Sequence, residues 1–377
     1  MTKSILSFFL LSLVLSLSLT VNSQKSKEQL LVIGTYTSEG SDGIYVYKFN
    51  TETGDNSFLS SVKTSNPSYL TISPNKKNVY AVNEDAPGNV TAFVFNKSNN
   101  KLLQLNQQPS QGKHPCYVTI DKTGKWVIVG NYSSGTLAVY PVNKDGSLGK
   151  PTDSVQHEGS SVNTERQESA HVHSTVLNKN NKTLYVPDLG MDKVLIYNLD
   201  SKNGKLKAFD PEFVMTEAGA GPRHIDIHPN GKYAYLIEEM TGSVSAYKIE
   251  SNGYLSLLQN ISGLPRDFNG AIGGADIHVS PDGKFLYCSN RGESNTIGIF
   301  SINQSNGELT WIDAQSTMGK TPRNFNFDPT GNFLLVANQN SDDIVIFKRE
   351  KSTGLLTDTG KRIKVSKPVC LKWMPIE

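Results

Sequence analysis

The sequence contains few cysteines for its length. Three occur among 377 residues, Cys116, Cys288 and Cys370, so at least one of them must stay unpaired. None belongs to a C-x-x-C motif, and each stands in an apolar, strand-like run. This placement predicts three small buried side chains rather than a disulfide framework or a cysteine-rich metal site.

Charged residues are also scarce, and neither sign dominates. Asp, Glu, Lys and Arg make up 19% of the chain, and 37 basic residues against 35 acidic ones leave a net charge of +2. This balance argues against a protein that binds nucleic acid by neutralising phosphates. The 31 glycines, 15 tyrosines and 15 phenylalanines indicate instead many short strands joined by tight turns.

The sequence lacks the common motifs that indicate cofactor binding. No G-x-S-x-G, Walker or dinucleotide-binding fingerprint occurs among the glycine-containing turns, so we expect no cofactor. The H-x-H pair His171 and His173 would place two imidazoles on one face of a strand, as in some zinc sites, but no spacing supplies a third ligand. Carboxylates are too few for a calcium-binding arrangement, and we therefore expect metal-free chemistry.

A long apolar run stands at the N-terminus. Lys3 precedes Ile5 to Leu19, where eleven of fifteen residues are apolar and four are serine. The run is short for a membrane span, and Val21-Asn22-Ser23 before Gln24 resembles a signal-peptidase site. We expect a signal peptide at residues 1–23, export to the periplasm or the cell exterior, and no stable membrane insertion after cleavage. An uncleaved membrane anchor is the alternative.

The remainder, residues 24–377, repeats one pattern. An apolar run, a turn of the form P-x-G-K, a second apolar run and then Asn or Asp recur every 45 to 55 residues or so. Clear copies are GPRHIDIHPNGKYAYLIEE from Gly221, ADIHVSPDGKFLYCSN from Ala275 and TPRNFNFDPTGNFLLVAN from Thr321. Two further strand signals follow each copy, which predicts four short strands per unit.

Seven copies of each strand signal can be counted, and their order predicts a closed ring. First strands are expected near Pro67, Pro115, His171, Pro222, Ala275, Pro322 and Pro368. The last of these lacks its own following strands, and the N-terminus lacks a first strand. We therefore predict an all-β fold, a single-domain seven-bladed β-propeller with four-stranded antiparallel blades, in which the C-terminal strand joins the N-terminal blade.

This topology places the start of each first strand and the end of each second strand at one mouth of the central channel. Asn83, Asn131, Asn290 and Asn338 end second strands, where turn-forming residues are expected on structural grounds. No turn needs a guanidinium or an imidazole, so other residues at the mouth suggest ligand binding or catalysis. They are His173, Arg223, His224, Glu239, Arg291 and Arg323.

The chain resembles the seven-bladed lactonase family, which includes bacterial propeller-type 6-phosphogluconolactonases. The resemblance rests on GAGPRHIDIHP from Gly219, ADIHVSPDG from Ala275, PRNFNFDPTG from Pro322 and ANQNSDDIVIF from Ala337. It implies metal-independent hydrolysis of a sugar lactone at the channel mouth. Residues on the family's motif positions are His173, Arg223, His224, Glu239, Asp276, His278, Arg291, Arg323 and Gln339. Glu238 stands where an Asn is common.

Lactone hydrolysis needs a base for the attacking water and a donor for the oxyanion. We expect His173 or Glu239 as the base, Arg223 as the carbonyl polariser, and Arg291 with Arg323 as a clamp for a phosphate or carboxylate. His224, Asp276, His278 and Gln339 complete the expected substrate-binding set. Two alternatives stay open: an exported carbohydrate- or ligand-binding propeller without turnover, and a muconate-type lactonising cycloisomerase.

Overall fold

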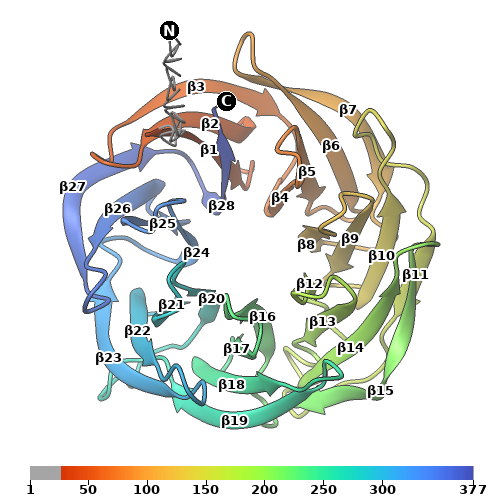
Figure 1. Cartoon of the computed structure of the whole chain (residues 1–377), viewed down its shortest axis with the longest axis vertical. Helices are drawn as coiled ribbons and strands as arrows, with labels where there is room; N and C mark the ends of the chain where they lie inside the picture. Colours follow the sequence, from red (N-terminus) through yellow and green to blue (C-terminus); the bar gives the residue numbers. More distant parts are fainter. Residues whose placement is uncertain (1–26, 377) are drawn as a thin grey trace, which may run out of the picture.

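The computed structural model describes residues 27–376 and shows a ring of seven blades around a central channel (Figure 1). Each blade is a four-stranded antiparallel sheet, and residues 27–376 contain no helix. The all-β, seven-bladed propeller is confirmed. The expected signal peptide at residues 1–23 lies outside the described residues.

The strands follow the chain from the channel outward, except in the first blade. Blade 1 contains β28 (Pro368–Pro375), β1 (Glu28–Thr35), β2 (Gly43–Asn50) and β3 (Asn56–Lys63). Blade 2 contains β4 (Leu70–Ile72), β5 (Asn78–Asn83), β6 (Asn89–Asn96) and β7 (Lys101–Pro109). Blade 3 contains β8 (Pro115–Ile120), β9 (Trp126–Asn131), β10 (Thr136–Pro141) and β11 (Asp153–Gln156). Blade 4 contains β12 (Val176–Leu177), β13 (Thr183–Asp188), β14 (Lys193–Asp200) and β15 (Lys205–Met215).

The last three blades are the most regular. Blade 5 contains β16 (Pro222–Ile227), β17 (Tyr233–Glu238), β18 (Ser243–Ile249) and β19 (Leu255–Ser262). Blade 6 contains β20 (Gly274–Val279), β21 (Phe285–Asn290), β22 (Thr296–Ile302) and β23 (Leu309–Ser316). Blade 7 contains β24 (Pro322–Phe327), β25 (Phe333–Asn338), β26 (Asp343–Arg349) and β27 (Leu356–Lys364).

The ring closes in blade 1, as the repeat count predicts. Strand β28 pairs antiparallel with β1, with Leu31 opposite Trp373 and Ile33 opposite Leu371. The two ends of the described chain therefore share one sheet, and the only unpaired edges are the innermost and outermost strands of the blades.

Apolar side chains from neighbouring blades form the core between them, and a tyrosine on the second strand repeats in four of these contacts. Tyr80, Tyr185, Tyr235 and Tyr287 donate their hydroxyls to the carbonyls of Gly146, Gly253, Gly307 and Gly354 in the next blade. Each of these glycines has a positive φ, which a residue with a Cβ rarely adopts. The repeat thus fixes the blade-to-blade spacing with one buried hydrogen bond.

The first strand of blade 4 differs from the sequence prediction. The repeat placed its start near His171, but the ladder covers only Val176 and Leu177. Residues 171–175 still follow β13, through a Val172–Asp188 bridge and a hydrogen bond from the His173 amide to the Pro187 carbonyl. Ser174 donates its hydroxyl to the Arg223 carbonyl of blade 5 instead of continuing the ladder.

All three cysteines are free and buried, as expected from their apolar surroundings. Within residues 27–376, no helix is long and apolar enough to cross a membrane.

Candidate active site

The position directly after each second strand forms one ring of side chains at the channel mouth. The second strands end at Thr35, Asn83, Asn131, Asp188, Glu238, Asn290 and Asn338. The next residues are Tyr36, Glu84, Tyr132, Leu189, Glu239, Arg291 and Gln339. Five of these seven, all except Leu189 and Gln339, line one cavity. The four terminal asparagines are buried and bind backbone carbonyls of the preceding loops, which gives them a structural role.

A second ring comes from bulges at the start of the first strands. Register shifts fall between Pro115 and Tyr117, between Pro222 and His224, and between Pro322 and Asn324. A β-bulge re-aims the extra residue, and here the extra residues are Cys116, Arg223 and Arg323. Because proline has no amide hydrogen to donate, it is tolerated at the first position of these strands. The repeated proline thus precedes the residue that the bulge turns into the channel.

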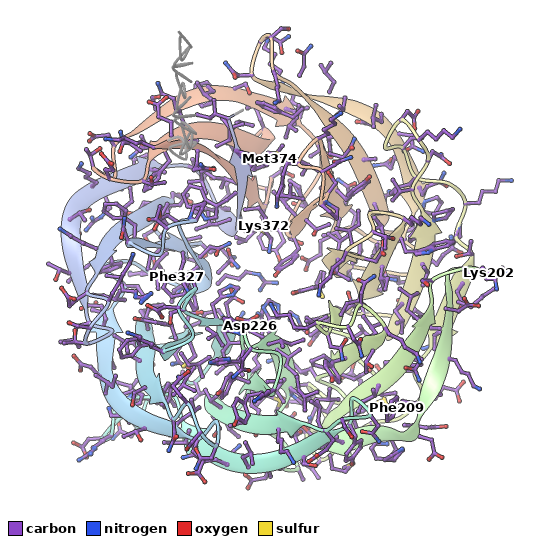
Figure 2. The ribbon with its side chains drawn as sticks, in the orientation of Figure 1. Lys202, Phe209, Asp226, Phe327, Lys372 and Met374 are labelled. Atoms are coloured by element: carbon purple, nitrogen blue, oxygen red, sulfur yellow. The ribbon has the colours of Figure 1, made fainter. Side chains whose placement is uncertain are left out.

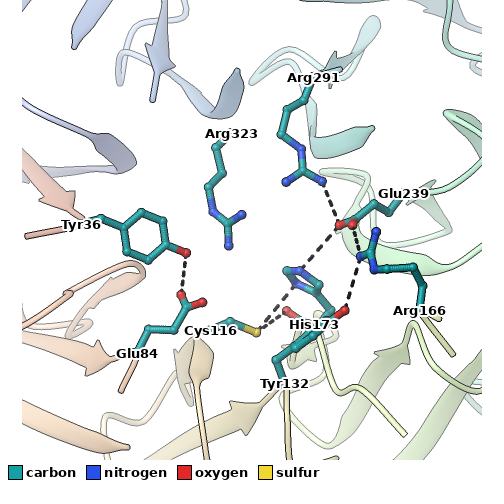
Figure 3. A pocket seen from close by; sticks show the side chains of 9 residues that line it. All are labelled: Tyr36, Glu84, Cys116, Tyr132, Arg166, His173, Glu239, Arg291 and Arg323. Atoms are coloured by element: carbon teal, nitrogen blue, oxygen red, sulfur yellow. Dashed lines mark hydrogen bonds and ion pairs between the residues drawn. The ribbon is translucent and has the colours of Figure 1, made fainter. Parts of the chain in front are cut away.

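The two rings enclose a cavity of about 350 Å³ at the mouth. Figure 3 shows its nine lining residues. They are Tyr36, Glu84, Cys116, Tyr132, Arg166, His173, Glu239, Arg291 and Arg323. Three guanidiniums and two carboxylates therefore face one small space, a balance that favours an anionic or carbonyl-bearing ligand.

Glu239 is bound by three arginines on one wall. One carboxylate oxygen accepts from Arg166 Nη2 at 2.6 Å, and the other accepts from Arg223 Nε at 2.9 Å and forms an ion pair with Arg291 Nη2, also at 2.9 Å. Burial alone would raise the pKa of Glu239, but Arg291 and Arg223 hold it well below its usual range. Glu239 is thus a firmly ionised anchor for the arginines around it.

Glu84 and Tyr36 stand on the opposite wall, from blades 2 and 1 (Figure 3). The Tyr36 hydroxyl donates to Glu84 Oε2 at 2.9 Å. Burial raises the pKa of Tyr36, so its hydroxyl stays protonated and remains a donor. The Arg323 guanidinium stacks on the Tyr36 ring at 5.4 Å from the centroid, and its side chain forms no hydrogen bond or ion pair with residues 27–376.

His173 lies at the base of the cavity between the two walls. Its Nε2 is 3.9 Å from Glu239 Oε2, and its Nδ1 is 3.8 Å from Cys116 Sγ. Burial, reinforced by Arg223, lowers the pKa of His173 well below the usual value, so the imidazole is neutral at pH 7. Burial also raises the pKa of the Cys116 thiol, which therefore stays protonated.

A buried polar layer closes the channel beneath the cavity. Asp276 binds His224 Nδ1 at 2.8 Å, His278 Nε2 at 3.1 Å and Asn324 Nδ2 at 2.5 Å. Tyr69 and Tyr117 stack at 4.1 Å between ring centroids, and both present an edge or face to His224. Farther along the channel, Asp226 and Lys372 lie beside the central opening in Figure 2.

The structure separates the candidate residues from the sequence into three groups. His173, Glu239, Arg291 and Arg323 line the cavity. Arg223 lies directly beneath it with 1% exposure, bound to Glu239, to His224 Nε2 at 3.2 Å and to the Ala275 carbonyl. His224, Asp276 and His278 belong to the layer below, and Gln339 is not among the lining residues.

Five lining residues were not among the sequence candidates: Tyr36, Glu84, Cys116, Tyr132 and Arg166. The signal for three of them was present, because Tyr36, Glu84 and Tyr132 occupy the repeat position of Glu239 and Arg291. Arg166 gives no such signal, since it comes from a loop outside the repeat. Glu238, the apparent departure from the family pattern, faces Ser245 and Asn260 instead of the cavity.

No three His, Cys, Asp or Glu side chains converge to hold a metal ion anywhere in residues 27–376. His171 and His173, the pair considered for zinc, point to different partners. His171 stacks on Tyr132 at 4.4 Å and its Nδ1 lies 3.1 Å from the Tyr132 carbonyl, whereas His173 faces Glu239 and Cys116.

Comparison with known proteins agrees with this geometry. The sequence matches the family described as "Lactonase, 7-bladed beta-propeller" over residues 30–373. The chain belongs to this lactonase family. The expected family is therefore confirmed, and it covers almost the whole described propeller.

Named members of the lactonase family are similar along nearly their full length. The 6-phosphogluconolactonase of Bacillus subtilis is 37% identical, over 91% of this chain and 97% of the relative. The 6-phosphogluconolactonase of Formosa agariphila is 39% identical, over 89% of this chain and 97% of the relative. The solved structure of the Pseudomonas aeruginosa periplasmic gluconolactonase is 37% identical with a TM-score of 0.89, over 93% of this chain and 100% of that one.

Proposed function

We propose that this protein hydrolyses a sugar lactone, as a 6-phosphogluconolactonase-like carboxylic ester hydrolase, in the cavity at the channel mouth. The observation that carries the proposal is the Arg323 guanidinium, which faces the cavity without an acceptor among residues 27–376. A carbonyl oxygen that becomes an oxyanion would supply that acceptor. Membership of the lactonase family and the names of its similar members support this reaction class.

The geometry changes the role proposed for Arg223. This side chain is buried beneath the cavity and its Nε and Nη1 already have partners, so we assign it to holding Glu239 rather than to polarising the carbonyl. Arg323 takes the carbonyl instead. Glu239 orients Arg166 and Arg291 on the other wall, and His173 lies neutral below the substrate.

The charge of the cavity favours an anionic lactone. Arg166, Arg291 and Arg323 outnumber Glu84 and Glu239, and Arg223 adds a further positive charge directly below. A phosphate or carboxylate on the sugar would reduce this excess, and we assign its binding to Arg291, which lies beside Arg323 in the cavity (Figure 3). His224, Asp276 and His278 act from below the cavity, through the contact of His224 with Arg223, and Gln339 lies outside the cavity lining.

Export is also part of the proposal. The N-terminal apolar run with its small-residue cleavage signal supports removal of residues 1–23, leaving 24–377 as the mature single-domain propeller. One similar family member is described as periplasmic. An exported enzyme would meet free aldonolactones as well as any phosphorylated ones.

The experiment is a hydrolysis assay of the purified native protein on neutral and phosphorylated gluconolactones, corrected for the spontaneous rate. We expect lactone loss and acid release well above background, unchanged by a chelator because no side-chain set between residues 27 and 376 fixes a metal. Binding of lactones without turnover would favour a ligand-binding propeller. Lactone formation from a muconate would favour a cycloisomerase.

The different roles proposed for Arg323 and Arg291 can be tested with two variants in the same assay. Arg323→Ala should lower kcat about 100- to 1000-fold on every lactone, because an oxyanion donor is lost. Arg291→Ala should mainly raise KM, and more for a phosphorylated lactone than for a neutral one. Equal effects of both variants on kcat and KM would contradict the division of roles.

A further inference from the structure

Proton transfer in this cavity needs a group whose acceptor capacity is not already taken, and most of the capacity of Glu239 is directed at arginines. Its two oxygens accept hydrogen bonds from Arg166 and Arg223 and form an ion pair with Arg291, at 2.6 to 2.9 Å. The charges that hold Glu239 ionised also make it a weak proton acceptor. Taking a proton there would leave Arg166, Arg223 and Arg291 without their shared counter-charge.

His173 is also poorly suited to accept a proton. An imidazolium at this buried position would stand beside the Arg223 guanidinium and against His224, at 5.3 Å between ring centroids. Its two nitrogens already face Glu239 Oε2 and Cys116 Sγ. We assign His173 to the shape and polarity of the cavity base.

Glu84 meets the geometric requirements. It lines the same cavity, is only half-buried, and has one side-chain hydrogen-bond partner among residues 27–376, the Tyr36 hydroxyl at 2.9 Å. No cation of the described chain lies within ion-pair distance of its carboxylate, unlike that of Glu239. Its second oxygen is free to accept a proton.

Figure 3 shows how the two acidic walls relate to Arg323. Glu84 and Glu239 lie on opposite sides of the cavity, and the Arg323 guanidinium reaches between them. A carbonyl oxygen bound to Arg323 would therefore present its carbon to a water held by Glu84. The cavity therefore holds two different carboxylates. That of Glu84 is free for proton transfer, and that of Glu239 is neutralised by arginines and has a structural role.

We propose that Glu84 is the proton acceptor of the reaction and that Tyr36 is a positioning residue for it. This assignment rests on the proposed lactone hydrolysis. It adds a catalytic residue from blade 2 to a site whose other charged groups come from blades 5 to 7 and from the loop that carries Arg166.

The proposed step conserves atoms and charge. The attacking water gives one proton to a Glu84 oxygen while its own oxygen bonds to the carbonyl carbon, and the carbonyl electron pair moves to the oxygen facing Arg323. Collapse of this intermediate breaks the ring C–O bond, and the ring oxygen takes the proton from Glu84. The product is an open-chain hydroxy acid that ionises in solvent, and Glu84 is again a carboxylate.

The test compares Glu84→Gln with the native full-length protein on the lactone that the native protein hydrolyses fastest. Glutamine keeps the size of the side chain and can still accept from Tyr36, so we expect kcat to fall about 100- to 10,000-fold with little change in melting temperature. Glu212→Gln, on the exposed face of the outer strand β15, is the matched control and should keep native turnover.

Three further variants keep the test decisive if Glu84→Gln folds poorly. Glu84→Asp should retain part of the activity, and Glu84→Ala should regain activity when formate is added, because formate can take the vacated carboxylate position. Tyr36→Phe should lower kcat about tenfold with little change in KM. Because a folding defect would also lower the apparent kcat at constant KM, kcat is calculated per folded protein, with the folded fraction measured by circular dichroism on the same sample.

The outcomes separate this assignment from the function it rests on. If the native protein is active and the kcat of Glu84→Gln is within threefold of the native value, the assignment of Glu84 is overturned and the lactonase proposal stands. A Glu84→Ala variant whose activity does not rise when formate is added would also overturn the assignment of Glu84. A native protein without turnover on any lactone would overturn the proposed function, and the role of Glu84 with it.

Discussion

At the scale of single residues, two buried carboxylates organise the channel in different ways. Glu239 binds arginines, whereas Asp276 binds two histidines and Asn324. Although burial alone would lower it, Asp276 raises the pKa of His278 to about 10. Burial and Arg223 lower the pKa of His224 to about 3. The layer below the cavity therefore holds one charged and one neutral imidazole on the same carboxylate.

This difference predicts a pH dependence of stability. His278 is protonated in the folded protein up to about pH 10, but in the unfolded chain only up to about pH 6.5. Its contribution is thus complete below about pH 6.5 and is lost as the pH rises towards 10. His278→Gln should cost about 3 kcal/mol of unfolding free energy at pH 6 and clearly less at pH 10. Urea unfolding of both proteins at the two pH values measures this, and an equal cost at both would contradict the ion pair.

At the scale of elements, the segment that leaves β11 builds part of the cavity wall. Strand β11 has four residues, against eight to eleven in the other outermost strands. The chain then crosses to the mouth and delivers Arg166 to Glu239. Its anchors include His157, bound to Asp188 at 2.7 Å and to Tyr197 at 3.0 Å, and Gln167, bound to the Leu189 carbonyl at 2.9 Å.

Loosening the first anchor should affect the cavity before it affects the propeller. In His157→Ala, we expect amide hydrogen exchange of residues 158–170 to increase at least about tenfold and KM to rise about three- to tenfold. Exchange in β16 to β19 should stay as in the native protein. Hydrogen-exchange mass spectrometry and steady-state kinetics provide both readouts, with the exposed Lys150→Ala as a control. Unchanged exchange in 158–170 would show that the anchor does not hold this segment.

At the scale of the whole molecule, stability depends on closure of the ring through β28. This strand gives β1 its inner partner and also binds blade 7, where the Leu371 amide donates to Asn324 Oδ1 at 2.8 Å and Asn326 donates to the Leu371 carbonyl at 2.9 Å. Removing it would expose the apolar edge of β1 and unpair Asn324, which also binds Asp276 in the channel.

Deleting residues 368–377 should therefore lower the melting temperature by at least about 10 °C or make the protein insoluble. Deleting only residues 376–377 leaves β28 in place and should have a small effect. Thermal unfolding of the soluble fraction and a solubility assay measure the difference. A protein without residues 368–377 that melts like the full chain would show that the ring does not need this strand.

Much of the fold could be predicted because it depends on short-range patterns. Alternating apolar residues and the P-x-G-K turns recur along the chain, so strands such as β16, β20 and β24 begin within a residue of their expected positions. Two first strands begin later than expected. Strand β4 starts at Leu70 instead of near Pro67, and β12 covers only Val176 and Leu177. Beside β12, Ser174 binds the neighbouring blade, a contact across 49 residues that no local pattern contains. The site was predicted in part for the same reason: His173, Glu239, Arg291 and Arg323 were found from their place in the repeat.

By itself, the sequence determined the seven blades, the closing strand and the mouth at which polar residues gather, since each follows from patterns a few residues long repeated in order. Only the tertiary structure decided which of those residues share a cavity. Arg223 lies beneath the cavity, bound to Glu239, whereas Tyr36, Glu84 and the loop residue Arg166 line the cavity. The physical reason is that seven equivalent backbone positions surround one axis, and the reach and pairing of each side chain across the channel determine which of them meet a ligand.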